Sequence, residues 1–230
     1  MKFLEFDETR DFPYYNHNPR ISKLGWLILL LSVPIAFLTY MYTSFVSELV
    51  GSILFMIIML IPLLYMSNWN YKLFIQKPTK NEIILGILLF IGYIIYSIII
   101  DAVLMKFGAN NPIDPSSLNI DYISLISLLF SMMGEELLKF IPLMFFLRLF
   151  YKFTNDRRIS LILSSIIILT CFGLLHYDYD GSVISVIVIQ GIGSIFELYG
   201  YLKTKNLFVP YLSHLLTDAF VFILILLGLG

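Results

Sequence analysis

The sequence predicts an all-α fold, a polytopic bundle of about seven transmembrane helices with its N-terminus in the cytoplasm. Hydrophobic residues make up 59% of the 230 residues, charged residues only 13%, and the mean hydropathy is +0.86. A soluble domain normally devotes about a quarter of its residues to charge. Long apolar runs recur along the chain without the alternation of a membrane barrel, and lipid offers the backbone no water, so helices are expected.

Seven apolar runs, separated by turn residues or charges, are long enough to cross a bilayer. They are Leu24–Thr43, Leu49–Met66, Glu82–Met105, Asp121–Phe150, Ile159–His176, Ser182–Leu202 and Phe208–Leu229. Pro34, Pro62 and Pro142 fall inside these runs, where neighbouring helices can satisfy the carbonyls that a proline frees.

The loops between the runs alternate in basic charge. Lysine and arginine gather in the N-terminal tail and in the second, fourth and sixth loops, whereas the odd-numbered loops hold only Lys106. By the positive-inside rule this alternation predicts a cytoplasmic N-terminus. We therefore expect a multi-pass protein of the cell membrane, surrounded by lipid. The segment Asp11–Tyr15 is expected either in the headgroup layer or in a disordered tail.

Several classes of protein are disfavoured by composition. No basic cluster suggests a nucleic-acid partner, and the net charge is −1. The single cysteine, Cys171, cannot form an intrachain disulfide or a cysteine metal cluster. The first 23 residues have no apolar core, so a cleaved signal peptide is not expected. No internal repeat of the transporter kind is visible.

Ionisable residues inside three of the predicted spans are the candidate functional residues. A charged side chain near the centre of a membrane helix costs about 2.5–3.5 kcal/mol, so such residues indicate function by default. The candidates are Glu135, Glu136 and Lys139 in the fourth span, His176 at the end of the fifth, and His214 and Asp218 in the seventh.

Helical spacing predicts that these groups share one site. Lys139 lies one turn after both Glu135 and Glu136 and can neutralise either carboxylate. Counted from the short fourth loop, Glu135 and His176 lie about 22 Å and 26 Å deep at the helical rise per residue. His214 is only about 9 Å from the cytoplasmic end of its span. A kink, a tilt or a sixth loop that dips into the membrane must therefore bring it level.

A carboxylate beside an imidazole can deprotonate a water molecule for hydrolysis. A second imidazole, with Asp218 one turn away, can donate a hydrogen bond to the oxyanion of a tetrahedral intermediate. Structural roles are the alternatives: an ion pair of Glu136 with Lys139, an interfacial His176, and a packing contact of His214 with Asp218. Gln190 and Glu197 in the sixth span have two interpretations, as cavity residues or as polar packing contacts, and the second is favoured.

The ordered motifs resemble the CPBP family of intramembrane endopeptidases. The abbreviation stands for CAAX protease and bacteriocin-processing, and the family is also called Abi. The motifs are Glu135-Glu136, then Phe172-x-x-x-His176, then His214-x-x-x-Asp218, and the resemblance covers about Asp121–Leu229. The family has an arginine where this chain has Phe140, and Lys139 stands one residue earlier. The Glu-Glu-x-x-Lys form is similar to PrsW-type membrane proteases, although those have glutamate at the position of His176.

The resemblance implies that Glu135 and His176 activate the hydrolytic water and that Glu136 supports them. It implies that His214 and Asp218 either stabilise the oxyanion or support the catalytic residues from behind. Lys139 and Phe172 are then in supporting positions. Residues 1–23 are then a cytoplasmic or interfacial tail, 24–120 the N-terminal spans and 121–230 the catalytic core.

The resemblance implies an intramembrane endopeptidase of the glutamate type, without a metal, acting on a membrane-associated peptide or protein. CAAX-type cleavage, maturation of a bacteriocin or signalling peptide, and self-immunity are the possible settings. The alternatives are a zinc-dependent protease built on two histidines and a carboxylate, a non-catalytic scaffold or immunity protein, and a proton-coupled transporter.

Overall fold

The computed structural model describes residues 11–16, 19–109, 120–177 and 182–229, and all regular structure within them is helical. The elements are α1 (Lys23–Ser44), α2 (Glu48–Met66), a short 3₁₀ turn η2 (Tyr71–Leu73), α3 (Lys80–Lys106), α4 (Tyr122–Thr154), α5 (Arg157–Leu175), α6 (Val183–Val186), a π-helical segment η4 (Ile187–Ile192), α7 (Ile195–Thr204) and α8 (Phe208–Leu226). The all-α prediction is confirmed.

Within the described residues, six helical stretches are long and apolar enough to cross a membrane. They are α1, α2, α3, α5, α8 and the continuous stretch Val183–Thr204 formed by α6, η4 and α7. Helix α4 is longer than all of them, at 33 residues, and carries Glu135, Glu136 and Lys139 in its middle. With α4 as the charged seventh span, the described part of the chain has the predicted bundle of about seven helices.

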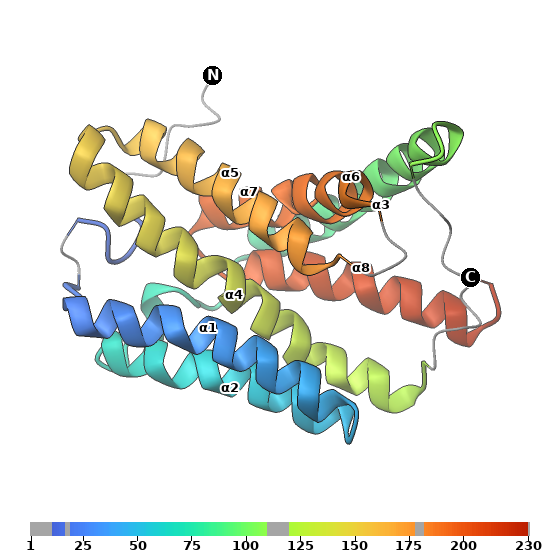
Figure 1. Cartoon of the computed structure of the whole chain (residues 1–230), viewed down its shortest axis with the longest axis horizontal. Helices are drawn as coiled ribbons and strands as arrows, with labels where there is room; N and C mark the ends of the chain where they lie inside the picture. The colour runs from blue at the N-terminus through green and yellow to red at the C-terminus, as the bar shows by residue number, and fades with distance from the viewer. Residues whose placement is uncertain (1–10, 17–18, 110–119, 178–181, 230) are drawn as a thin grey trace.

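Helix α4 is the centre of the bundle (Figure 1). The pair α1 and α2 packs on one side of it, and α5 and α8 pack against it elsewhere, while α3 contacts α7 and α8. Fifteen residues of α4 are buried, more than in any other helix of the described chain. The charged residues in the middle of α4, Glu135, Glu136 and Lys139, therefore face protein rather than lipid.

The described part of the N-terminal tail packs against protein. Phe12, Tyr14 and Tyr15 are buried, and the Tyr14 hydroxyl lies 2.6 Å from the Ser67 hydroxyl. Burial raises the pKa of Tyr14 to about 12. The expectation of a disordered tail is wrong for Asp11–Tyr15, because these aromatic rings pack against the protein, whereas the position in the headgroup layer stays a prediction. Residues 1–10 lie outside the described chain.

The sixth loop is set inside the protein. Lys205, Asn206 and Leu207 are buried between α7 and α8. The Asn206 side chain accepts a hydrogen bond from the Gln76 backbone at 2.9 Å and donates one to its carbonyl at 3.1 Å. Although His214 is close to the start of α8, its Nδ1 lies 2.8 Å from Glu136 Oε1 in the middle of α4, so the two residues lie at the same level.

Candidate active site

Two adjacent glutamates on α4 point into different surroundings. Successive residues of a helix are rotated by about 100°, so Glu135 and Glu136 leave α4 on different sides. Glu136 is 3% exposed, whereas the Glu135 side chain is 20% exposed. One carboxylate is therefore held within the protein and the other faces a hollow.

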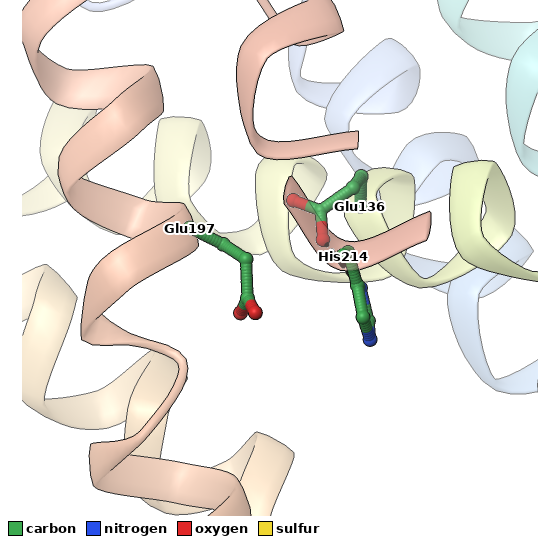
Figure 2. Close-up of side chains that lie close together, drawn as sticks. All are labelled: Glu136, Glu197 and His214. Atoms are coloured by element: carbon green, nitrogen blue, oxygen red, sulfur yellow. Dashed lines mark hydrogen bonds and ion pairs between the residues drawn. The ribbon is translucent and has the colours of Figure 1, made fainter. Parts of the chain in front are cut away.

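Glu136 belongs to a closed network of charges. Its Oε1 lies 2.6 Å from Lys139 Nζ and 2.8 Å from His214 Nδ1. Lys139 Nζ also donates a hydrogen bond at 3.2 Å to Glu197 Oε2, which comes from α7. Figure 2 shows Glu136, Glu197 and His214 gathered from three helices. All four groups are buried, and each has an oppositely charged or hydrogen-bonding partner.

Glu135 has a different environment. Its Oε2 atom is buried but has no hydrogen-bond partner in the described chain. The Nε2 atoms of His214 and His176 are the imidazole nitrogens beside it, at 3.6 Å and 3.9 Å. Both distances are too long for a hydrogen bond, and a polar gap of this size is suited to a bridging water.

His176 is fixed at the C-terminal end of α5. Its Nδ1 lies 2.9 Å from the carbonyl oxygen of Phe172, one turn earlier. A carbonyl can only accept, so this contact assigns the proton to Nδ1 and, in the neutral ring, leaves the lone pair on Nε2. That lone pair faces Glu135.

Phe172 and Asp218 complete the surroundings of the two histidines. The Phe172 ring lies 4.6 Å from the His176 ring and 6.4 Å from the His214 ring, with Lys139 Nζ at 4.5 Å from its centroid. Asp218 Oδ2 lies 4.0 Å from His214 Nε2. The motif spacing on α8 therefore places a third carboxylate within reach of His214.

A cavity of about 110 Å³ opens between these groups. Its lining includes Glu135, His176, His214 and Asp218, together with Gln190 and Glu197. By volume it has room for a few water molecules, since each water occupies about 30 Å³ in the liquid. The structure thus brings the candidate residues of three spans around one polar hollow.

Glu197 and Gln190 were undervalued by the sequence interpretation. Glu197 is 2% exposed and pairs with Lys139. Gln190 and Glu197 both line the polar cavity. Their position in a glycine-rich span was the feature of the sequence that could have indicated a close approach to the site. Gly173 and Gly191 let α5 and η4 approach so closely that a Cβ on Gly173 would lie 3.0 Å from the Gly191 Cα. This close crossing brings the sixth span, with Glu197, next to the histidine at the end of α5.

Phe140, at the position of the family's arginine, does not line the polar cavity. Its ring packs 5.3 Å from Tyr201 and 6.4 Å from Tyr14. Lys139 supplies the cation instead, and of the two glutamates that it could neutralise it binds Glu136.

Metal-ligand atoms of Glu136, Glu197 and His214 lie within 4.8 Å of one another, which is a spacing that could hold a cation. The ammonium of Lys139 already stands between these two carboxylates, at 2.6 Å and 3.2 Å. This set contains one histidine, whereas the zinc alternative requires two histidines and a carboxylate. These residues therefore fit a buried ion-pair network better than a zinc site.

Residues 118–220 match the family model described as type II CAAX prenyl endopeptidase Rce1-like. This region of the chain is Rce1-like. The match confirms the resemblance to the CPBP family of intramembrane proteases. The Rce1-like region contains every candidate catalytic residue, while α1, α2 and α3 lie outside it. No curated protein and no solved structure matches the chain.

Proposed function

We propose that the protein is a glutamate-type intramembrane endopeptidase that hydrolyses a peptide bond in a membrane-associated peptide or protein. The observation that carries the proposal is the environment of Glu135: a buried Oε2 without a hydrogen-bond partner in the described chain, beside two imidazoles at 3.6 Å and 3.9 Å. A buried carboxylate oxygen without a hydrogen bond costs free energy, so the surroundings of Glu135 Oε2 indicate a binding place for a polar molecule.

A water molecule between Glu135 and His176 would be well oriented for attack. Glu135 Oε2 and His176 Nε2 both accept hydrogen bonds, because Nδ1 of His176 bonds the Phe172 carbonyl. A water that donates one hydrogen to each keeps its oxygen lone pairs directed outward. The two side chains thus act together, Glu135 as the general base and His176 as the orienting partner.

The proposed reaction conserves atoms and charge. The water oxygen bonds to the carbonyl carbon of the scissile peptide while one water proton passes to Glu135. The carbonyl oxygen becomes an oxyanion, which accepts a hydrogen bond from Nε2–H of His214. When the intermediate collapses, the carbon–nitrogen bond breaks and Glu135 passes its proton to the leaving amine. The products are a carboxylic acid and an amine.

His214 can donate from Nε2 when both of its ring nitrogens carry protons. Its Nδ1 bonds the Glu136 carboxylate at 2.8 Å, and its Nε2 faces Glu135 at 3.6 Å and Asp218 at 4.0 Å. Glu197 adds another carboxylate to the cluster, and Lys139 is the ammonium among them. A protonated His214 reduces this excess of negative charge in a medium that penalises unpaired charge.

Residues 121–230 supply all of these groups, which supports their assignment as the catalytic core, with 24–120 as the N-terminal spans. The position of Lys139 Nζ between the carboxylates of Glu136 and Glu197 supports a metal-free mechanism. The alternation of basic loops supports the cell membrane with a cytoplasmic N-terminus. CAAX-type cleavage, bacteriocin or signal-peptide processing and self-immunity all fit this chemistry.

The proposal is tested by comparing the membrane peptidomes of cells that carry the wild type and the Glu135→Ala variant at equal protein levels. We expect peptides that are cut in the first and intact in the second. The same bonds should be cut by purified wild-type protein in liposomes. Identical peptidomes, together with equal activity of the purified variant, would rule out Glu135 as the base.

A further inference from the structure

An apolar pocket lies against the reactive side of the site. It has a volume of about 220 Å³, and its lining includes Phe37 and Tyr40 of α1, Phe55 of α2, Leu138 of α4 and Leu175 of α5. Glu135, Phe172 and His176 line it as well, and these three residues also line the polar cavity. The two hollows therefore meet at the groups that would activate the water.

The pocket wall next to Glu135 depends on a glycine. A Cβ on Gly134 would meet the Phe55 ring, so an alanine there would force the ring to move. The Phe55 ring packs against Tyr40, with centroids 5.2 Å apart and planes at 28°. Gly134 thus lets an aromatic pair from α1 and α2 stand directly beside Glu135.

The pocket reaches the outer surface of the bundle. Phe37 and Tyr40 are half-buried, and Leu175 is 42% exposed at the rim. An apolar side chain could therefore enter from the bilayer between α1 and α5. Its backbone would then lie beside Glu135 and His176, where the polar cavity begins.

The volume limits what can fill the pocket. A cavity of about 150 Å³ lined by apolar side chains holds one benzene molecule. The 220 Å³ found here therefore suits one large apolar or aromatic side chain, such as leucine or phenylalanine. At the same volume per carbon, a 15-carbon farnesyl chain would need about 375 Å³.

We propose that this pocket is a specificity subsite that binds one large apolar side chain of the substrate next to the scissile bond. The inference rests on the proposed function and adds the substrate class: unmodified apolar peptide segments rather than a requirement for a prenyl group. Its determinants, Phe37, Tyr40 and Phe55, lie outside the Rce1-like match.

The test uses the full chain in liposomes and a synthetic peptide library with randomised residues in an apolar segment. Sequencing the products by mass spectrometry gives the residues that flank the cut bond. Tyr40→Ala enlarges the pocket and Leu175→Trp fills it from the rim. Tyr42→Ala on α1 and Leu174→Trp on α5 are the matched controls, because both residues are exposed and neither lines the pocket.

We expect the wild type to prefer leucine or phenylalanine on one side of the cut bond. Tyr40→Ala should shift the preference toward tryptophan, and Leu175→Trp should shift it toward alanine. A methylene gained or lost in a hydrophobic pocket changes selectivity by about 10- to 200-fold, so a shift of at least tenfold is expected. The two controls should keep the wild-type preference.

Two results overturn the subsite. The first is cleavage that depends on Glu135 with the same flanking preference in all five proteins. The second is cleavage of a farnesylated cysteine peptide alone, with a rate that Leu175→Trp does not change. Absence of any cleavage that depends on Glu135 contradicts the proposed function instead.

Binding is measured separately from turnover. A peptide that carries photoreactive leucine is crosslinked to the Glu135→Gln variant, and the labelled residues are mapped. We expect labels on the wall formed by Phe37, Tyr40 and Phe55, and we expect Leu175→Trp, but not Leu174→Trp, to remove them. If Leu175→Trp does not change the labelling, the photoreactive leucine binds elsewhere. That result overturns the subsite even if the peptide is cleaved by the wild type.

Discussion

The two sides of α4 differ in how completely their charges are paired. On one side, Glu136 binds both Lys139 and His214, and Lys139 also binds Glu197. On the other side, Glu135 Oε2 has no hydrogen bond in the described chain, and its neighbours His176 and His214 stand at 3.9 Å and 3.6 Å. The two glutamates are adjacent in sequence but differ in their surroundings.

This difference suggests that Glu136 stabilises the fold and that Glu135 takes part in the reaction. A charge buried with its partners in good geometry keeps one arrangement, and removing one partner is costly. A carboxylate with an unpaired oxygen beside a polar hollow can instead exchange a proton with a bound molecule. We therefore expect substitutions of Glu135 to affect the reaction and substitutions of Glu136 to affect the fold as well.

The largest expected effect is on turnover. Glu135→Gln and His176→Gln should each lower kcat by about 10²–10⁴-fold, the usual contribution of a positioned general base. Since the two side chains share one water, the double variant should be about as slow as the slower single variant. Peptide cleavage in liposomes measures all three rates, and thermal unfolding should remain near that of the wild type. Losses that multiply in the double variant would show that the two residues act separately.

Glu136 should show the opposite balance. Glu136→Leu leaves Lys139 and His214 buried without their shared acceptor, so we expect a loss of about 3–5 kcal/mol in unfolding free energy. Unfolding in mixed detergent measures this change. The double variant Glu136→Leu with Lys139→Met removes both charges and should recover part of the stability, but no activity. A Glu136→Leu protein as stable as Glu135→Gln would remove the contrast between the two sides of α4.

The helices and the site motifs could be predicted from the sequence because local patterns determine them. Apolar runs gave the spans, and the spacing of Glu135, His176 and His214 predicted a shared site. The partner of Lys139 on α7 could not be predicted, because it depends on how closely α5 and η4 cross at Gly173 and Gly191. The contact of His214 with Glu136 at 2.8 Å could not be predicted either, because it depends on how α8 packs against α4.

The apolar side of the site was also absent from the sequence interpretation. Phe37, Tyr40 and Phe55 lie in spans without internal charge, where an aromatic residue is indistinguishable from one that packs against lipid or a neighbouring helix. Only the packing of α1 and α2 against α4 brings these rings beside Glu135.

A smaller effect is expected at Glu197, which touches the paired side of α4 through Lys139. Glu197→Gln keeps an acceptor for the ammonium but loses the charge, so we expect a loss of about 1–3 kcal/mol in stability. Because Glu197 is expected to act through its ion pair with Lys139, kcat should fall while KM stays constant. Ile195→Ala is the control on the same helix, since Ile195 is exposed and does not line the polar cavity. An unchanged kcat in Glu197→Gln would limit Glu197 to packing.

The smallest effect is expected from metal removal. If Lys139 is the cation that balances Glu136 and Glu197, then EDTA or dipicolinate should leave the cleavage rate of the purified protein unchanged. Lys139→Met supplies the contrast: it frees both carboxylates, and with His214 they form a ligand set within 4.8 Å that could then take up zinc. Zinc binding to Lys139→Met but not to the wild type, measured by metal analysis after dialysis, would support this view. A rate that falls with chelator and returns with zinc in the wild type would contradict the metal-free mechanism.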